Sequence, residues 1–450
     1  MALGRNDLRE LQWDLMPLGL SSLGRLESRV MTTLDSVVRS CAHIAQEEPP
    51  VEYQLREKFL WGEDILEENS RMLLGKEPDD RYTRIMVTLD TQAAWQPQIT
   101  LDLVARGMSV ARINCAHDDE AVWQAMIGNV RAASGQLGKP CVISMEIPGP
   151  KVRIDRVLTS LRRARANQGD LIFLTARQKM GLPQGIPIAV SCSMPELMQQ
   201  LDNGEPVIID DGRVETVVLE CRDDGVVLKA TKVFKDNGVR VALEKGVNFP
   251  GSDYKIPLLS KRDEGILTFI CQHADVIGCS FVRDEEDIRL LQTEINKRLE
   301  APDTKPIIIK IETLASMRIL PSILAAAAGR VPTGVMTARG DLAVEVGYAR
   351  LSEYQEEIPW ICEAAHVPVI WATQVVETMV KTGIPTRAEI SDVTLAAKSE
   401  CIMLNKGEHI NDAIVFVDDI LTKFEEHVYK KTAILRKLSI AGEMFGETKG

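Results

Sequence analysis

The stretch Ile307-Ile308-Ile309-Lys310-Ile311-Glu312 places two charged side chains directly after three consecutive isoleucines. An uninterrupted β-branched run of this kind is typical of a strand that is buried on both faces of a parallel sheet. Four other short apolar runs also end in polar residues, namely Arg112 with Asn114, Glu146, Arg339-Gly340-Asp341, and Thr373 with Gln374. A parallel barrel gathers its chemistry at the C-terminal ends of its strands. The sequence therefore predicts a parallel barrel that carries these side chains on one rim.

The order of the segments supports this interpretation. From Ile85 onward, strand-like runs alternate with amphipathic helical stretches, which indicates βα units. Residues 153–247 break the alternation with short β-like runs between turns such as Asp210-Asp211-Gly212. We expect an α/β protein with a (β/α)8 TIM barrel, an inserted small β-barrel domain and a separate N-terminal helical module. The expected boundaries are 1–80 for the helical module, 81–152 and 248–425 for the two parts of the barrel, 153–247 for the insertion and 426–450 for a C-terminal tail.

Composition excludes several classes of function. The chain of 450 residues has a net charge of −12, which argues against nucleic-acid binding because that needs a basic surface. No apolar run approaches the roughly 18 residues of a membrane span, and the N-terminus lacks the pattern of a signal peptide. The nine cysteines form no CxxC pair. We expect a reduced, soluble, cytoplasmic protein without nucleic-acid or membrane partners.

Seven motifs occur in an order that resembles the pyruvate kinase family from about residue 83 to 425. They are Ala111-Arg112-Ile113-Asn114, Gly149-Pro150-Lys151-Val152-Arg153, Lys245-Gly246-Val247-Asn248-Phe249-Pro250-Gly251, Lys310-Ile311-Glu312, Ala338-Arg339-Gly340-Asp341-Leu342, Ala372-Thr373-Gln374 and Pro385-Thr386-Arg387-Ala388-Glu389. The resemblance implies transfer of a phosphoryl group from phosphoenolpyruvate to ADP, which gives pyruvate and ATP. It also implies dependence on Mg²⁺ or Mn²⁺.

The residues themselves suit this chemistry. Glu312 and Asp341 offer the carboxylate oxygens that Mg²⁺ prefers, although helix capping or ion pairing would explain them equally well. Lys310 lies two residues before Glu312, so both side chains leave a strand on the same face. Its ammonium could stabilise a phosphoryl group and an enolate oxygen. The guanidinium of Arg112 matches a phosphate. Thr373 resembles the threonine that the family uses, through water, to protonate the enol carbon, and it could also cap a helix.

The resemblance assigns the remaining site residues. Substrate binding is expected from Arg112, Ser280, Phe281, Lys310, Ala338, Arg339, Gly340, Asp341 and Thr373, of which Arg112, Lys310 and Thr373 are expected to be catalytic. The backbone N–H groups of 339–341 would hold the substrate carboxylate at a helix N-terminus. Nucleotide binding is expected from Asn114, His117, Arg153, Asp211, Lys245 and Lys406.

The chain departs from the family at the site where many members bind K⁺. Asn114 is retained, but the three other positions read Ala116, Glu146 and Ile147. Lys151 occupies a position where K⁺-dependent members carry glutamate and K⁺-independent members carry lysine. We therefore expect no K⁺ and interpret Lys151 as an internal cation.

Further departures leave alternatives open. The segments Asp90-Thr91 and Asn405-Lys406 replace family motifs near the nucleotide, and the chain stops soon after the barrel, so we expect it to lack the family's C-terminal effector domain. One alternative is a phosphotransferase or lyase that acts on a different enolpyruvate or 2-oxo-acid substrate. Another is a catalytically silent, metabolite-binding regulator. A homo-oligomer, dimer or tetramer, is also expected.

Overall fold

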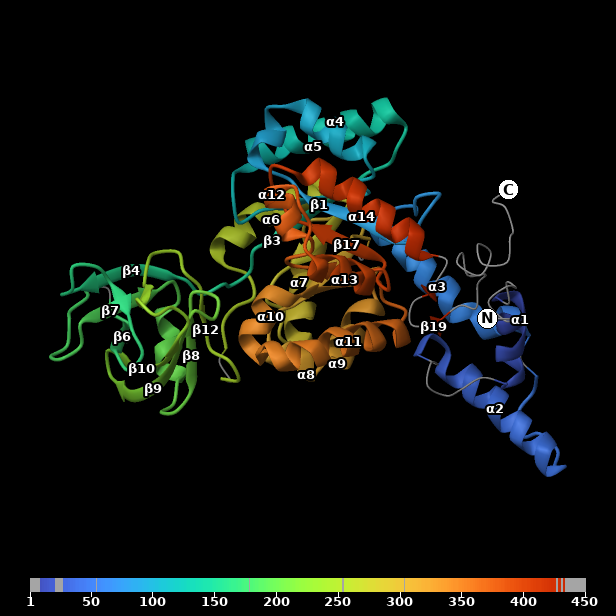
Figure 1. The fold of residues 1–450 in the computed structure, drawn as a ribbon, viewed down its shortest axis with the longest axis horizontal. Helices are drawn as coiled ribbons and strands as arrows, with labels where there is room; N and C mark the ends of the chain where they lie inside the picture. The colour runs from blue at the N-terminus through green and yellow to red at the C-terminus, as the bar shows by residue number, and fades with distance from the viewer. Residues whose placement is uncertain are drawn as a thin grey trace.

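A closed barrel of eight parallel strands forms the centre of the protein (Figure 1). The computed structural model describes residues 9–20, 27–53, 55–177, 179–252, 255–302, 304–425, 428–429 and 432–433. The barrel strands are β1 (Arg84–Thr88), β2 (Val110–Asn114), β3 (Val142–Ile147), β13 (Val276–Cys279), β14 (Ile307–Ile311), β15 (Thr333–Ala338), β16 (Val369–Ala372) and β17 (Cys401–Leu404). They pair in the order β1-β17-β16-β15-β14-β13-β3-β2. The expected α/β class and TIM barrel are confirmed.

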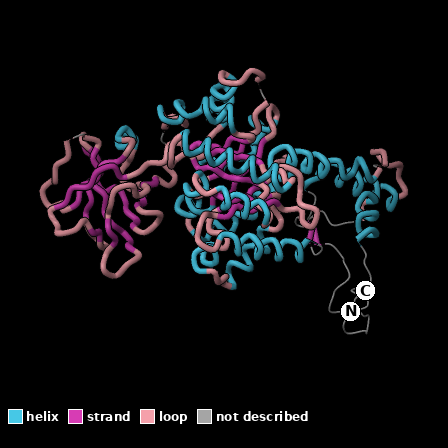
Figure 2. Tube along the Cα trace, turned by 90° about the horizontal axis from the view of Figure 1, so that it is seen from above, coloured by secondary structure: helices cyan, strands magenta, loops and turns pink. Residues whose placement is uncertain are grey.

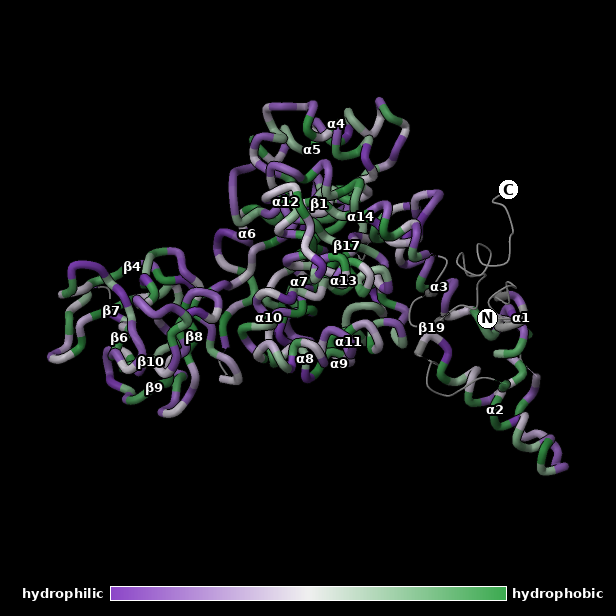
Figure 3. Tube along the Cα trace, viewed as in Figure 1, coloured by the Kyte–Doolittle hydropathy of each residue, from purple (hydrophilic) through white to green (hydrophobic). Residues whose placement is uncertain are grey.

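Helices cover the outside of the barrel. They are η4 (Thr91–Ala94), α4 (Pro97–Ala105), α5 (Glu120–Leu137), α6 (Lys261–His273), α7 (Glu285–Asn296), α8 (Leu314–Arg318), α9 (Leu320–Ala328), α10 (Arg339–Val346), α11 (Tyr348–Ala364), α12 (Glu377–Thr382), α13 (Arg387–Ala396) and α14 (Ile410–Glu425). Every residue of β14 is buried, as its isoleucines predict. Figure 3 shows apolar residues concentrated along the central strands. Among the described residues, no helix is both long and apolar enough to cross a membrane.

The insertion lies to one side of the barrel (Figures 1 and 2). It contains β4 (Ile154–Thr159), β5 (Arg165–Ala166), β6 (Leu171–Thr175), β7 (Ile188–Cys192), η5 (Pro195–Gln200), β8 (Pro206–Ile209), β9 (Val214–Arg222), β10 (Gly225–Val233), β11 (Val239–Arg240) and β12 (Val247–Asn248). Seven strands pair in the order β12-β8-β9-β10-β6-β7-β4, and β5 pairs with β11. The N–H of Ile154 donates to Lys245 O at 2.9 Å and that of Val247 to Val152 O at 2.9 Å. These bonds join the segments at the two edges of the sheet, which begin with β4 and β12.

The N-terminal helices project from the opposite side of the barrel (Figure 1). They are α1 (Arg9–Leu15), η2 (Met16–Leu18), η3 (Glu27–Arg29), α2 (Val30–Ala45) and α3 (Arg56–Leu74). The last of these N-terminal helices, α3, is not separate from the barrel. Its residues Leu73 and Leu74 are fully buried in a cluster with inward-facing strand residues such as Ile308 and Met336. Gly334 in β15 leaves room for Leu73, because a Cβ at that glycine would overlap the leucine side chain. The end of α3 therefore closes the N-terminal end of the barrel, which the expectation of a separate module did not include.

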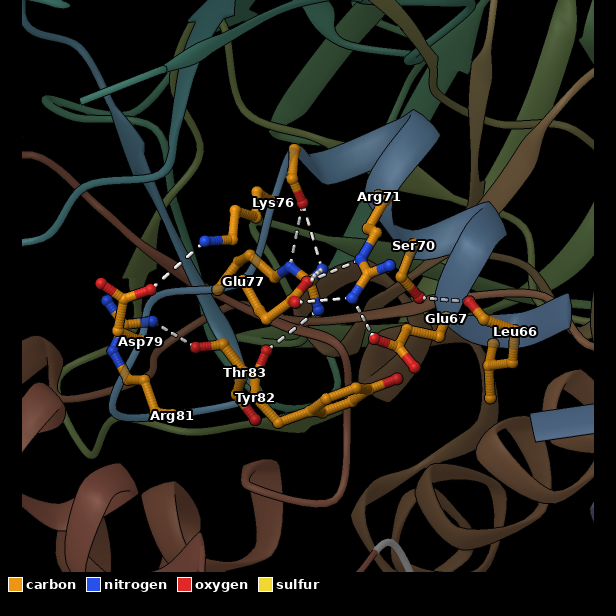
Figure 4. A network of polar contacts seen from close by, with 12 residues as sticks. Leu66, Glu67, Ser70, Arg71, Lys76, Glu77, Asp79, Arg81, Tyr82 and Thr83 are labelled. Atoms are coloured by element: carbon orange, nitrogen blue, oxygen red, sulfur yellow. Dashed lines mark hydrogen bonds and ion pairs between the residues drawn. The ribbon is translucent and has the colours of Figure 1, made fainter. Parts of the chain in front are cut away.

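A polar network fixes α3 to the first barrel strand (Figure 4). The guanidinium of Arg84 is fully buried and donates to the carbonyls of Gly75 and Tyr82 and to the carboxylate of Glu77. Arg71 of α3 donates to the same carboxylate at 2.8 and 3.0 Å. The hydrogen bonds from Arg71 lower the pKa of Glu77 to about 2. Glu77 therefore stays ionised and links the two arginines at neutral pH.

The expected C-terminal tail lies largely outside the described residues, which include only β18 (Val428–Tyr429) and β19 (Thr432–Ala433) beyond residue 425.

Candidate active site

The C-terminal ends of adjacent strands bring the predicted residues to one rim. Arg112 lies near the end of β2, Lys310 near the end of β14, and Glu312 directly after β14. Asp341 lies in the first turn of α10, which follows β15 without a loop. Thr373 directly follows β16. This is the end of a TIM barrel at which active sites form.

Glu146, at the end of β3, connects two of the predicted phosphate-binding cations. Its carboxylate accepts hydrogen bonds from Nε and Nη2 of Arg112 at 2.7 and 2.6 Å. It also accepts one from Lys310 Nζ at 3.0 Å. Gly278 on the neighbouring strand makes room for this carboxylate, because a Cβ there would lie 3.3 Å from Glu146 Cγ. The three side chains form one buried ionic cluster.

The charges of this cluster stabilise one another. Burial alone would raise the pKa of Glu146, but Arg112 and Lys310 outweigh burial and lower it to about 2. Burial alone would lower the pKa of Lys310, but Glu146 and Glu312 raise it above its ordinary value. All three groups are therefore ionised at neutral pH. Lys310 uses its three donors on Glu146, on Ser280 Oγ at 2.9 Å and on Glu312 at 2.8 Å.

Arg112 keeps donors for a ligand. Its Nη1 donates to Thr88 Oγ1 at 2.9 Å, and Glu146 takes the edge formed by Nε and Nη2. A guanidinium has five N–H donors, so two remain at the end of the fork. Glu146 thereby orients Arg112 without using all of its donors.

Glu312 is held by the loop after β13. Its Oε2 accepts a hydrogen bond at 2.6 Å from the N–H of Phe281, a residue with a left-handed φ of 58°. Burial raises the pKa of Glu312 above its ordinary value, and the nearby carboxylate of Asp341 adds to this rise while Lys310 opposes it. A cation between the two carboxylates would relieve their repulsion.

Lys151 reaches the second predicted metal ligand. Its Nζ lies 2.6 Å from Asp341 Oδ1, and it lies 5.9 Å from the centre of the Phe281 ring. Both predicted ligands therefore form ion pairs with lysines, as one of the alternative interpretations expected. The described residues contain no group of three or more histidine, cysteine or carboxylate side chains suited to a metal. Two carboxylates nevertheless fit Mg²⁺, which is commonly held by one or two carboxylates together with substrate oxygens and water.

Thr373 and the start of α10 touch each other. The backbone of Thr373 has a left-handed φ of 70°. Its methyl group lies so close to Gly340 that a Cβ at the glycine would be 2.7 Å from Thr373 Cγ2. Thr373 caps no helix, since α12 begins after Val376 without a side-chain cap. The side chain of Arg339 turns away to Asp392, so only its backbone N–H could face a ligand.

Comparison with known proteins agrees with this arrangement. Residues 80–413 match the family model described as pyruvate kinase, barrel domain. The chain belongs to the pyruvate kinase family. It is 31% identical over 351 residues to pyruvate kinase 2 of Trypanosoma brucei brucei, which covers 75% of this chain and 66% of the relative. It is 31% identical to a pyruvate kinase of Bacillus licheniformis, covering 78% and 58%. A crystal structure of a pyruvate kinase from Cryptosporidium parvum aligns with a TM-score of 0.70 at 28% identity, covering 80% of this chain and 73% of that one. The matched part of the chain thus spans 66% and 58% of the lengths of these two relatives.

The residues predicted from the pyruvate kinase resemblance to bind nucleotide fall into three places. Arg153 and Lys245 lie where the insertion joins the barrel, where Arg153 donates to Glu244 O and Lys245 pairs with Asp210 at 2.7 Å. Asp211 follows Asp210 in the turn beside them. Asn114 is the last residue of β2, and its side-chain Oδ1 accepts from Ala116 N. His117 lies in the loop that follows, and its backbone carbonyl accepts from Trp123 Nε1. Lys406, after β17, pairs with Asp90 after β1 at 3.2 Å.

Two residues that contact the predicted site residues were missed as functional candidates. Glu146 was predicted to lie on the rim and to depart from the K⁺ site, but it was given no role of its own; in the structure it lies beside Asn114 in the barrel register. Asp392 lies only five residues after the motif residue Arg387, but no local pattern indicates that it contacts Arg339.

Proposed function

We propose that this protein transfers the phosphoryl group of phosphoenolpyruvate to ADP, with Mg²⁺ or Mn²⁺ and without K⁺. The observation that carries the proposal is the convergence of Lys310, Arg112, Glu312 and Asp341 on one barrel rim. Two cations and two carboxylates on this rim can bind a phosphorylated enol and a divalent ion together.

Glu312 and Asp341 would hold the divalent ion. When bound, the ion supplies positive charge to the phosphoryl and carboxylate oxygens of the substrate. Lys310 would then donate to the transferring group in place of one of its present partners. The free N–H groups of Arg112 would bind the phosphoryl oxygens. The N–H groups at the start of α10, from Arg339 to Asp341, would hold the substrate carboxylate.

The proton that completes pyruvate would reach the enol carbon from the side of Thr373. Its hydroxyl has no protein hydrogen-bond partner among the described residues, so it is free to hold a water molecule. A threonine is too weak an acid to supply the proton alone, so we assign it the orientation of that water.

Lys151 would replace K⁺ in this site. Its ammonium lies beside Asp341, and Glu146 uses both carboxylate oxygens on Arg112 and Lys310. A permanent cation at this place supplies charge that does not depend on the salt in solution. The nucleotide would lie between the loop after β2 and the insertion, and the protein would act as a cytoplasmic homo-oligomer.

A second candidate rests on a specific observation. All three donors of Lys310 are already bound to groups of the chain itself. A protein that bound a metabolite without turnover, or a different 2-oxo acid, could keep this arrangement unchanged.

The test uses the purified full chain with phosphoenolpyruvate, Mg²⁺ and each of several nucleoside diphosphates, followed by ³¹P NMR. The proposal expects loss of phosphoenolpyruvate and formation of ATP in equal amounts, and Lys310→Met should abolish both. Thermal stabilisation by phosphoenolpyruvate without turnover would favour the silent binder. Turnover with another acceptor would favour the different phosphotransferase.

A further inference from the structure

The turn that carries Thr373 is strained. Thr373, Gln374 and Val376 have φ values of 70°, 58° and 45°, in the left-handed region that side chains other than glycine rarely adopt. Such conformations cost on the order of 1–3 kcal/mol each and persist only where surrounding contacts enforce them. The contacts that hold this turn therefore determine where the Thr373 hydroxyl points.

Arg339 makes these contacts. Its Nε donates to Ala372 O at 2.9 Å and its Nη2 donates to Thr373 O at 2.8 Å. Its guanidinium also lies over the ring of Trp371, with Cζ 4.6 Å from the ring centre. One side chain from α10 thus binds three consecutive residues at the end of β16.

Asp392 in α13 holds Arg339 in this position. Its carboxylate accepts from Nη1 and Nη2 of Arg339 at 2.5 and 2.7 Å, a bidentate pair that fixes the plane of the guanidinium. The same carboxylate accepts from Trp371 Nε1 at 3.2 Å. The side chains of Arg339 and Asp392 are only 12% and 20% exposed, so water screens this pair weakly.

We propose that Asp392 is a positioning residue for Thr373 and acts through Arg339. It keeps the guanidinium turned toward the carbonyls of Ala372 and Thr373, and so keeps the Thr373 hydroxyl on the substrate side. Its effect on proton transfer rests on the proposed function, whereas its hold on the turn does not.

The experiment compares the unmodified chain with Asp392→Asn, which keeps the volume and removes the charge. Amide hydrogen exchange is followed by mass spectrometry for peptides that cover residues 372–380. We expect at least tenfold faster exchange there and no change in peptides from β14. The matched control is Asp419→Asn on α14, whose side chain is 59% exposed and pairs with Lys423. Unchanged exchange at 372–380 in Asp392→Asn would overturn the proposal.

The second readout is the exchange of pyruvate methyl protons into deuterated water, observed by NMR. The step that protonates the enol carbon must, in reverse, remove a methyl proton. Asp392→Asn should slow this exchange at least tenfold while KM for phosphoenolpyruvate changes less than twofold. In a Thr373→Ala background, Asp392→Asn should have no further effect. An additive effect would show that Asp392 does not act through Thr373.

The outcomes separate the two proposals. If the unmodified chain neither consumes phosphoenolpyruvate nor exchanges pyruvate protons, the proposed function fails, and amide exchange alone decides the role of Asp392. If Asp392→Asn does not fold, the experiment uses Arg339→Lys instead. This substitution keeps the positive charge but removes the two hydrogen bonds that Arg339 donates to the carbonyls of Ala372 and Thr373. Arg339→Lys should then give the same increase in amide exchange, and a turn that stays protected would overturn the proposal.

Discussion

The carboxylate of Glu146 binds Arg112 side-on, with both oxygens 2.6–2.7 Å from guanidinium nitrogens, and shares Oε1 with Lys310. This single carboxylate compensates two buried cations. Its removal would take from Arg112 the carboxylate to which it is hydrogen-bonded and would leave Lys310 with Glu312, in a site where Arg112 and Lys310 are at most 9% exposed.

Glu146→Gln should therefore destabilise the protein strongly. Breaking a buried ion pair on one side costs about 3–5 kcal/mol, because the remaining charge is left uncompensated. Urea unfolding of the two proteins at pH 7 measures this change. The control is Glu220→Gln, which removes an exposed partner of Arg222 and should leave the unfolding midpoint unchanged. Equal midpoints for Glu146→Gln and the unmodified chain would contradict the importance of this cluster.

Glu312→Gln tests the metal site. Loss of the carboxylate removes one of the two proposed ligands and keeps the volume. A metal that acts as a Lewis acid contributes several kcal/mol to the transition state, so turnover should fall by at least about 100-fold. The midpoint of activation in a Mg²⁺ titration should rise at the same time. Circular dichroism should show an unchanged fold, and full activity at ordinary Mg²⁺ would exclude Glu312 as a ligand.

Lys151 should make the activity independent of monovalent cations. Turnover at equal ionic strength should agree within about twofold in Na⁺, K⁺ and tetramethylammonium buffers, because the ammonium beside Asp341 is permanent. Lys151→Glu should reduce turnover severely, and added K⁺ should not restore it, since Ala116 and Ile147 offer no side-chain oxygen. Strong activation of the unmodified chain by K⁺ would refute the internal cation.

Sequence patterns predicted the rim because strand ends in a parallel barrel must meet. The isoleucine run before Lys310 and Glu312 was sufficient to place both residues at one end of a buried strand. The same reasoning cannot predict which side chains on that rim form hydrogen bonds or ion pairs with each other. Whether Arg112 faces Glu146 depends on the register and curvature of the whole barrel, which no local pattern encodes.

Two other features could not be predicted from the sequence, for related reasons. The direction of the Arg339 side chain is decided by Asp392, which lies 53 residues away in the chain. The burial of Leu73 inside the barrel depends on the absence of a side chain at Gly334. An amphipathic helix pattern shows that a face is apolar, but it does not identify the surface that the face contacts.

Glu345 should make stability depend on pH. It lies in α10 beside Asn248 of the insertion, with Asn248 Nδ2 3.5 Å from its Oε1, and burial raises its pKa to about 7. The unfolded carboxyl releases its proton near 4.5 while the folded one retains it. Stability is therefore lost as pH rises from about 4.5 to 7, by on the order of 3 kcal/mol at most. Glu345→Gln should flatten this slope in urea unfolding between pH 5 and 7.5. An identical slope in the variant would show that Glu345 does not titrate in this range.

Leu73 and Gly334 should be energetically coupled if α3 closes the barrel. Leu73→Ala would leave a cavity among the inward-facing residues and should cost about 2–5 kcal/mol. Gly334→Ala would place a methyl group against the leucine and should cost about 1–3 kcal/mol by overpacking. In the double variant the new methyl enters the space that the leucine vacated, so the total loss should be smaller than the sum of the two single losses. Urea unfolding of the four proteins completes the cycle, and an interaction energy above about 0.5 kcal/mol is expected for residues in contact. Simple additivity would mean that the helix end does not occupy the barrel floor in solution.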